Sequence, residues 1–243
     1  MHRLLNPQTR DPDALGLCAL AVMTKAPRAG QVKTRLVPPL TPDEAAQLNR
    51  CFLRDTAEAI ALAGHNIARG VAVYTPVGSE ADYVDILPAQ FALVPQRGAD
   101  FGERLTNAAH DLFSVGFVSV CLIDSDSPTV AAETYALAAE LLGRAGDRVV
   151  LGPSDDGGYY LIGLKQLHRR LFVDIEWSTG RVLEQTIARA REINLPIELL
   201  PTGYDVDDAA GLRRLRDELL GAGSTTIASH TREFIGRLQH NRL

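Results

Sequence analysis

The sequence predicts a single α/β domain with a mainly parallel sheet and helices on both of its faces. Short runs rich in apolar and β-branched residues alternate along the chain with longer segments of helical periodicity. The short runs are continuously apolar, as strands covered on both faces require. With 243 residues, 46% of them hydrophobic, the chain is long enough for a substantial core, and no repeat or linker divides it.

Strands and helices follow one another in a regular order. The apolar runs predict strands over residues 17–24, 70–76, 91–95, 117–124 and 147–153. Helical patterns predict helices over residues 41–60, 103–113, 131–145, 179–193 and 209–220. The first of these helices has the clearest start, because Thr41 is a good N-cap, Pro42 suits the first helical position and Glu44 completes a capping box.

The two ends of the chain lie outside this pattern. Residues 1–16 have no uninterrupted apolar stretch of the kind found in signal peptides, and we expect them to form a flexible extension. The domain is then expected over residues 17–222, followed by a helical tail over 223–243. The tail could pack on its own domain or on a second subunit, which leaves a homodimer open. No run approaches 18 apolar residues, so no membrane span is expected.

Charge and cysteine content narrow the function classes. A net charge of -5 argues against nucleic-acid binding, which depends on lysine and arginine neutralising phosphates, so a polyanionic partner should be small and bound locally. Cys18, Cys51 and Cys121 are far apart and lie in apolar runs, which predicts reduced core residues and a cytoplasmic location.

A basic loop follows the first predicted strand. The stretch "KAPRAGQVKTRL" (residues 25–36) contains four cations and no carboxylate, and it lies where open α/β sheets bind ligands. Gly30 would let the backbone approach a phosphate, which Lys33 and Arg35 would contact. The alternative is a set of solvated surface charges, and Arg28 fits that description. The predicted nucleotide-binding residues of this loop are Lys25, Gly30, Lys33, Thr34 and Arg35.

Acidic residues end two other apolar segments. Asp124 and Asp126 follow the strand over 117–124, and Asp205 and Asp207 follow an apolar segment about 80 residues later. Carboxylates from two strand ends are typical ligands of a metal that bridges phosphates, so Mg²⁺ or Mn²⁺ is expected here. The alternative is helix capping, by Asp126 or Ser127 in the first segment and by Asp207 or Asp208 in the second.

Three further segments are weaker candidates. In "GPSDDGGYYLIGL", Asp155 and Asp156 precede Gly157 and Gly158, which could bring backbone against a ligand or simply form a hairpin turn. In "QRGADFGERL", Gly102 could seat a base or ribose. Trp177, the only tryptophan, could be a packed aromatic or a wall of a substrate site. None of the six histidines falls in these loops, which disfavours zinc or histidine-based chemistry.

Taken in order, the motifs "KAPRAGQVKTRL", "GERL", "DSDSP", "GPSDDGGYYLIGL", "IEWST" and "DVDD" resemble one family. They are similar to bacterial glycosyltransferase-like proteins of the nucleotide-diphospho-sugar transferase superfamily, some linked to arsenosugar biosynthesis. The resemblance spans about residues 17–220. It implies a GT-A fold, which is a single Rossmann-like domain with a mixed sheet.

The resemblance also implies roles for individual residues. Asp126 and Asp207 occupy the positions of the two metal ligands, with Asp124 and Asp205 as further candidates. The acceptor-side motif would comprise Asp156, Gly157, Gly158 and Tyr159, together with Trp177. The chain departs from the family in carrying Asp124 where glycine is usual and "DVDD" in place of D-x-D-T, so the choice of metal ligand among the paired acids stays open.

Two reactions are compatible with these motifs. The first is metal-dependent glycosyl transfer from a nucleotide sugar to a small acceptor, with Asp156 activating the acceptor hydroxyl. The second is nucleotidylyl transfer from a nucleoside triphosphate to a phosphorylated small molecule, because "KTRL" also resembles the loop of 2-phospho-lactate guanylyltransferase. Lys33 and Arg35 would then neutralise departing pyrophosphate. A non-catalytic nucleotide-binding regulatory module is a third alternative, against which the retained acids argue.

Overall fold

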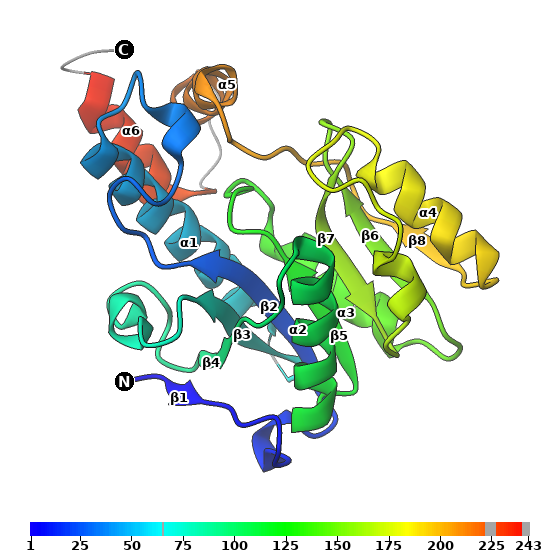
Figure 1. The fold of residues 1–243 in the computed structure, drawn as a ribbon. Coiled ribbons are helices and arrows are strands. Elements are labelled where there is room, and N and C mark those ends of the chain that lie inside the picture. The colour runs from blue at the N-terminus through cyan, green and yellow to red at the C-terminus, as the bar shows by residue number, and fades with distance from the viewer. Residues whose placement is uncertain (65, 222–226, 240–243) are drawn as a thin grey trace.

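The computed structural model describes residues 1–64, 66–221 and 227–239, and within them one sheet runs through the molecule in the order β1-β4-β3-β2-β5-β7-β6-β8 (Figure 1). The strands are β1 (Arg3–Leu4), β2 (Cys18–Lys25), β3 (Ala68–Thr75), β4 (Ala92–Pro95), β5 (Ser119–Ile123), β6 (Val149–Pro153), β7 (Tyr159–Leu164) and β8 (Ile197–Leu199). Strand β7 is antiparallel to its neighbours β5 and β6, and the other pairs are parallel. The predicted α/β class and mostly parallel mixed sheet are confirmed.

Helices cover both faces of the sheet. Buried side chains of α1 and α3 pack on one face, and those of α2 and α4 pack on the other (Figure 1). The helices are α1 (Pro42–Gly64), α2 (Phe101–Val115), α3 (Ala132–Gly143), α4 (Val182–Glu192), α5 (Ala209–Leu220) and α6 (Ser229–Gln239), with short 3-10 helices η1 (Pro12–Ala14), η2 (Thr34–Leu36), η3 (Glu80–Tyr83) and η4 (Arg169–Phe172). Each helix predicted from periodicity is present.

Helix α1 begins as its capping signals predict. The Thr41 backbone N–H donates to Glu44 Oε2 at 2.7 Å, and the Glu44 N–H donates to Thr41 Oγ1 at 3.2 Å. This reciprocal capping box satisfies two N–H groups that would otherwise lack partners in the first turn. It fixes the point where the basic loop ends and the helix starts.

The N-terminal segment differs from the flexible extension expected over residues 1–16. Strand β1 pairs in parallel with β4, and the side chains of Leu5 and Ala14 are buried. Asp11 is also buried and forms ion pairs with Arg3 and Arg69. Local sequence could not reveal this packing, because the partners lie some 60 to 90 residues further along the chain.

Helix α6 packs on α1 of its own chain, beside α5 (Figure 1). Asp55 of α1 caps its first turn: the His230 and Thr231 backbone N–H groups donate to the two Asp55 carboxylate oxygens at 3.0 and 2.9 Å. Residues 223–226 and 240–243 of the predicted tail lie outside the described residues.

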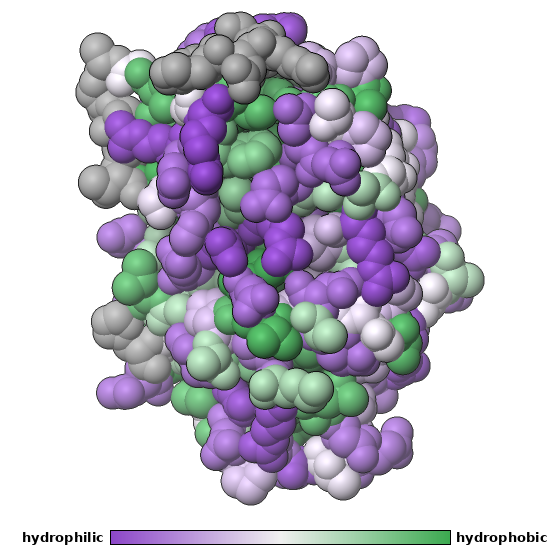
Figure 2. Space-filling view, turned by 90° about the vertical axis from the view of Figure 1, so that its left-hand side faces the viewer, coloured by the Kyte–Doolittle hydropathy of each residue, from purple (hydrophilic) through white to green (hydrophobic). Residues whose placement is uncertain are grey.

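The remaining surface and core features follow the composition. Cys18, Cys51 and Cys121 are free and buried. Of the described helices, none combines the length and the apolar character that crossing a bilayer requires. Polar side chains dominate the face shown in Figure 2, with apolar ones scattered between them.

We expect Asp55→Ala to destabilise the fold by about 1–3 kcal/mol, because it leaves two N–H groups of the first turn of α6 without their acceptor. Denaturant unfolding followed by circular dichroism measures this loss. Glu58→Ala is the matched control: Glu58 lies one turn away on α1, and its carboxylate pairs with the His230 ring at 2.7 Å on the surface. Its cost should stay within about 0.5 kcal/mol, and equal costs for the two variants would contradict the capping role.

Candidate functional site

The predicted motifs meet at one edge of the sheet for a topological reason. The basic loop follows β2, and Asp124 and Asp126 follow its parallel neighbour β5. The segment with Asp205 and Asp207 follows β8, which runs in the same direction. Because β7 is antiparallel, its beginning, next to Asp156, lies at this edge too. The site therefore forms where the carboxyl ends of the parallel strands meet, as is general for open α/β sheets.

The ammonium of Lys33 holds two of these loops together. It lies 2.8 Å from Asp126 Oδ1 and 3.0 Å from Asp207 Oδ1, and it donates to the Val206 carbonyl at 2.8 Å. Its three protons are thus all engaged, and its side chain is 4% exposed. We call this arrangement of Lys33, Asp126 and Asp207 the lysine clamp. The expected ammonium aimed at a phosphate is instead buried between two carboxylates.

The backbone and the charges both support the lysine clamp. Lys33 has φ 48°, a left-handed conformation that costs a non-glycine residue about 1 kcal/mol and is typical of functional positions. Burial alone lowers the pKa of Lys33, but the charges and hydrogen bonds of Asp126 and Asp207 outweigh it and raise the pKa above its usual value. The Val206 N–H also donates to the Asp126 carbonyl at 3.0 Å, which ties the two acidic segments directly.

Helix capping does not explain either clamp aspartate. Helix α3 begins at Ala132, well beyond Asp126 and Ser127, so neither caps it. Helix α5 is capped by Asp208, whose carboxylate accepts from the backbone N–H groups of residues 210 and 211. Asp126 and Asp207 are both partly exposed, and the second carboxylate oxygen of each lies outside the short contacts of the lysine clamp. Of these two oxygens, Asp207 Oδ2 lies 3.7 Å from the Arg35 guanidinium.

The two remaining acids differ from the clamp pair. Asp124 accepts from the Ser127 hydroxyl at 2.8 Å and from the Asp126 N–H at 3.3 Å, which shapes the loop that presents Asp126. Burial and then the negative charge of Asp126 raise the pKa of Asp124 to about 8. Burial, with the charges of Asp156 and Asp207, raises the pKa of Asp205 to about 6. Both groups carry less negative charge near neutral pH than ordinary aspartates.

The basic loop lines a small cavity beside the lysine clamp. This loop cavity, of about 250 Å³, is lined by Lys25, Lys33, Thr34, Arg35 and Asn49, among others. Arg35 is 74% exposed and its guanidinium lies 3.7 Å from Asp207 Oδ2, so most of this side chain is open to solvent. Asn49 of α1 was not anticipated, and its buried Oδ1 has no hydrogen-bond partner among the described residues.

Two other residues of the basic loop have different roles. Arg28 was expected to be a solvated charge, and it pairs with Asp82 at 2.8 Å on the surface. Gly30 has φ 72°, and a Cβ there would meet nothing within 4 Å. The positive φ suits the turn of the loop, and contact of Gly30 with a nucleotide stays a prediction.

The turn between β6 and β7 presents Asp156 and supports a neighbouring loop. Asp156 Oδ1 accepts from the Gly158 N–H at 2.8 Å, while Asp155 points away and pairs with Arg214. Gly157 has φ 89°, and a Cβ there would lie 2.1 Å from the Gly180 carbonyl oxygen. The glycine is thus needed because the turn packs against the loop that carries Trp177.

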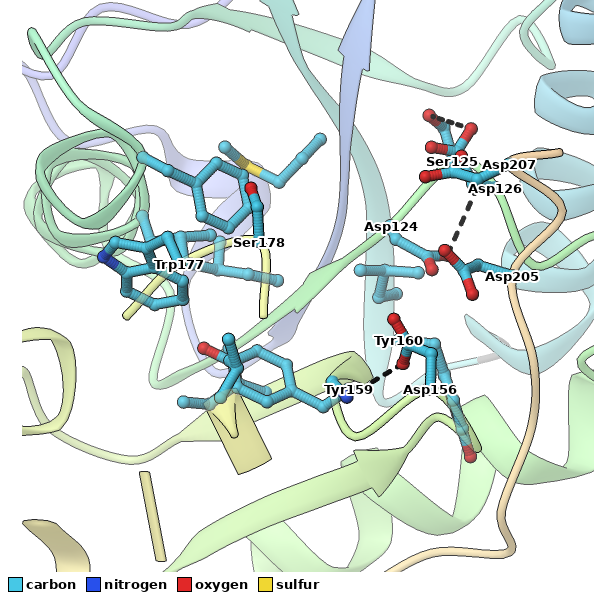
Figure 3. A pocket seen from close by; sticks show the side chains of 18 of the residues that line it. Asp124, Ser125, Asp126, Asp156, Tyr159, Tyr160, Trp177, Ser178, Asp205 and Asp207 are labelled. Atoms are coloured by element: carbon cyan, nitrogen blue, oxygen red, sulfur yellow. Dashed lines mark hydrogen bonds between the residues drawn. The ribbon is translucent and has the colours of Figure 1, made fainter. Parts of the chain in front are cut away.

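A larger cavity lies between the acids and an aromatic pair (Figure 3). This main cavity measures about 460 Å³ and shares Arg35, Ser125, Asp126 and Asp207 with the loop cavity. Its carboxylate wall consists of Asp124, Asp126, Asp156, Asp205 and Asp207, and its apolar wall includes Phe101, Leu105, Leu122, Ile162, Trp177 and Val182. Trp177 and Ser178 lie across the cavity from the acids in Figure 3.

Trp177 packs against an aromatic neighbour and also lines the main cavity. It contacts Phe101 edge to face, with ring centroids 5.0 Å apart and planes at 75°. A Cβ on Gly102 would lie 2.9 Å from Trp177 Nε1, so this glycine makes room for the indole. Gly102 lines neither the loop cavity nor the main cavity but a third one, together with Phe172 and Trp177, and its contact with a nucleotide stays a prediction.

Sequence reasoning missed the apolar wall. Phe101, Leu105, Leu122 and Ile162 belong to a helix and two strands, and apolar residues there predict only core packing. The one available signal is Phe101, an aromatic residue that lies at the start of a helix and next to Gly102. Tyr159 also lines the main cavity, and its acceptor-side role stays a prediction.

The chain matches the sequence model of one protein family. Residues 56–179, just over half of the chain, match the sequence model of a family described as "Uncharacterized protein conserved in bacteria (DUF2064)". The chain belongs to this family. No curated protein matches the chain.

Among solved structures, the fold is shared with nucleotide-dependent transferases. The chain is similar to a "putative nucleotide-diphospho-sugar transferase" from Desulfovibrio desulfuricans G20, with 28% identity, a TM-score of 0.82 and coverage of 93% of this chain and 96% of that one. A CMP:2-keto-3-deoxy-manno-octonic acid synthetase complexed with CTP has a TM-score of 0.53 and 10% identity, over 82% and 96% of the chains. A 4-diphosphocytidyl-2C-methyl-D-erythritol synthase from Anaerococcus prevotii DSM 20548 has a TM-score of 0.52 and 9% identity, over 83% and 95%. The last two likenesses show the fold alone.

We expect Gly157→Ala to destabilise the protein by more than about 2 kcal/mol, since a methyl group would collide with the Gly180 carbonyl and the turn would have to open. Thermal and denaturant unfolding measure the loss. Gly30→Ala is the matched control, because it also has a positive φ but open space around it, and it should cost about 1 kcal/mol. If both substitutions cost the same, packing against Gly180 is not what requires Gly157.

Proposed function

We propose that this protein is a metal-dependent glycosyltransferase that uses a nucleotide sugar as donor and a small molecule as acceptor. The observation that carries the proposal is that Asp126 and Asp207, from two separate strand-end segments, both contact the Lys33 ammonium at the ligand-binding edge of the sheet. The fold shared with the "putative nucleotide-diphospho-sugar transferase" at 28% identity supports it.

The chemistry of the two clamp carboxylates fits a divalent cation. Mg²⁺ and Mn²⁺ favour oxygen ligands, usually one or two carboxylates together with substrate phosphates and water. Asp126 and Asp207 already neutralise the Lys33 ammonium from both sides, and each keeps a second carboxylate oxygen beyond its contact with Lys33. A bound metal would supply Lewis-acid stabilisation of the leaving diphosphate. Asp124, whose oxygens are engaged in its own loop, is a weaker ligand candidate.

The loop cavity is suited to the diphosphate of the donor. The exposed guanidinium of Arg35 offers a planar pair of donors to phosphate oxygens, and Lys25 and Thr34 line the same space. Lys33 acts indirectly, because it fixes the two carboxylates and leaves no proton for a phosphate. We therefore propose Lys33 as a positioning residue and Arg35 as a phosphate ligand.

The main cavity then holds the transferred sugar and the acceptor. An acceptor hydroxyl attacks the anomeric carbon, and the bond from that carbon to the diphosphate oxygen breaks. The electron pair leaves with the nucleoside diphosphate, and the hydroxyl proton passes to the Asp156 carboxylate, which the Gly158 N–H holds at the cavity wall.

Nucleotidylyl transfer is the second candidate, and the cationic character of the loop cavity favours it. A triphosphate carries more charge than a sugar diphosphate, and Arg35 with Lys25 would neutralise departing pyrophosphate. The two reactions differ in their products. Glycosyl transfer releases a nucleoside diphosphate, whereas nucleotidylyl transfer releases pyrophosphate.

A thermal-shift panel of nucleotide sugars and nucleoside triphosphates, each with Mg²⁺ and with a chelator, tests the proposal. We expect one nucleotide sugar and its nucleoside diphosphate to stabilise the protein in the presence of Mg²⁺, and no pyrophosphate release from any triphosphate. Asp126→Asn should lose the metal-dependent part of the shift, because it weakens a charged metal ligand. Asp155→Asn is the matched control and should keep the shift, since Asp155 points away from the site toward Arg214.

Several outcomes would overturn the proposal. A triphosphate preference with pyrophosphate release would establish nucleotidylyl transfer in its place. A nucleotide-sugar shift that survives the chelator and Asp126→Asn would remove the metal from the account. A panel without any shift would contradict both reactions and support a different ligand class.

A further inference from the structure

The main cavity has two chemically different walls that face each other across the space where an acceptor would lie. One wall carries five aspartates, and the other carries apolar side chains of α2, β5, β7 and the loop before α4. Figure 3 shows Trp177 on one side and Asp124, Asp205 and Asp207 on the opposite side. A ligand that fills this cavity must satisfy both walls at once.

The apolar wall has a buried floor and an aromatic rim. Leu105, Leu122 and Ile162 are buried and close the floor, while Phe101 remains 47% exposed at the rim. Phe101 and Trp177 contact each other edge to face, which fixes the orientation of both rings. A large aromatic surface held open to a cavity is what a ring with an apolar face would cover.

The charges of the cavity disfavour an anionic acceptor on the side of Asp156. Of the described residues that line the main cavity, Arg35 is the one with a positive side chain, and it also lines the loop cavity where the donor phosphates are proposed to bind. Lys33 is already neutralised by Asp126 and Asp207. Asp156 and Asp205 belong to the same wall and add negative charge to it beyond the clamp. Away from the clamp, where the metal is proposed to bind, a phosphate or carboxylate on the acceptor would thus meet the like charge of Asp156 and Asp205.

We infer that the acceptor is an uncharged alcohol that carries a ring with an apolar face, which packs against Trp177 and Phe101 while its hydroxyl faces Asp156. This inference rests on the proposed function, because that function makes the ligand of the main cavity an acceptor. The predicted binding preference is the same whichever donor is used. It also disfavours the phosphorylated substrate that the nucleotidylyl alternative requires.

Trp177 is the only tryptophan of the chain, so its fluorescence reports this cavity directly. The probes are phenyl β-D-glucopyranoside, the same compound carrying a 6-phosphate, and glucose, titrated into the full-length protein with Mg²⁺ but without donor. We expect a saturable change in Trp177 emission with the phenyl glucoside and, by calorimetry, binding of the phosphorylated probe and of glucose that is weaker by about tenfold or more.

Variants separate the two walls. Trp177→Ala should weaken binding of the phenyl glucoside by about tenfold in calorimetry, and Trp177→Phe should keep it within about threefold, because it retains a ring at the wall. Phe101→Ala, at an exposed position, is the second test of the aromatic rim should Trp177→Ala fail to fold. Asp156→Asn should reduce the difference in affinity between the neutral and the phosphorylated probe.

Equal or tighter binding of the phosphorylated probe would overturn the inference, as would undiminished binding in both Trp177→Ala and Phe101→Ala, or no binding of any probe. Failure of the proposed function looks different. A triphosphate preference with pyrophosphate release would remove glycosyl transfer, while a preference for the neutral ring-bearing probe would still establish what the main cavity binds.

Discussion

The site depends on one interaction, the ion pair that Lys33 forms with both Asp126 and Asp207. Without Lys33, the two carboxylates that approach it from separate segments would repel each other. The buried ammonium, with its three protons satisfied, removes that repulsion. The lysine clamp joins the basic loop to the segments after β5 and β8. It thereby sets the positions of Arg35 in the loop cavity and of the carboxylate wall in the main cavity.

The same geometry divides the chemistry of the site between two cavities. Cations are exposed on the loop side, where phosphates would lie, and are absent from the main cavity apart from Arg35, within the described lining residues. The turn around Gly157 packs against Gly180 and brings the loop of Trp177 to the far side of the main cavity. A charged donor would therefore bind in the loop cavity and an uncharged acceptor in the main cavity, with the lysine clamp between them.

Much of the fold and part of the site could be predicted from the sequence. Helix α1 was predictable because its signal is local, with Thr41 and Glu44 forming the capping box. Asp126 and Asp207 were expected near one another because strand ends meet at one edge. The inward turn of Lys33 was not predictable, since it depends on a left-handed backbone and on partners about 90 and 170 residues away. The apolar wall escaped notice because residues such as Leu122 have the same signature whether they line a cavity or fill the core.

The most direct test of the account is the position of the metal. Crystals soaked with Mn²⁺ and a nucleoside diphosphate would reveal it by anomalous diffraction. The account predicts an anomalous peak within coordination distance of the Asp126 and Asp207 carboxylates, beside Lys33. A peak at Asp55, Glu58 and His230, the acidic group between α1 and α6 whose carboxylate Asp55 already caps a helix, would contradict it, and so would the absence of any peak at the clamp.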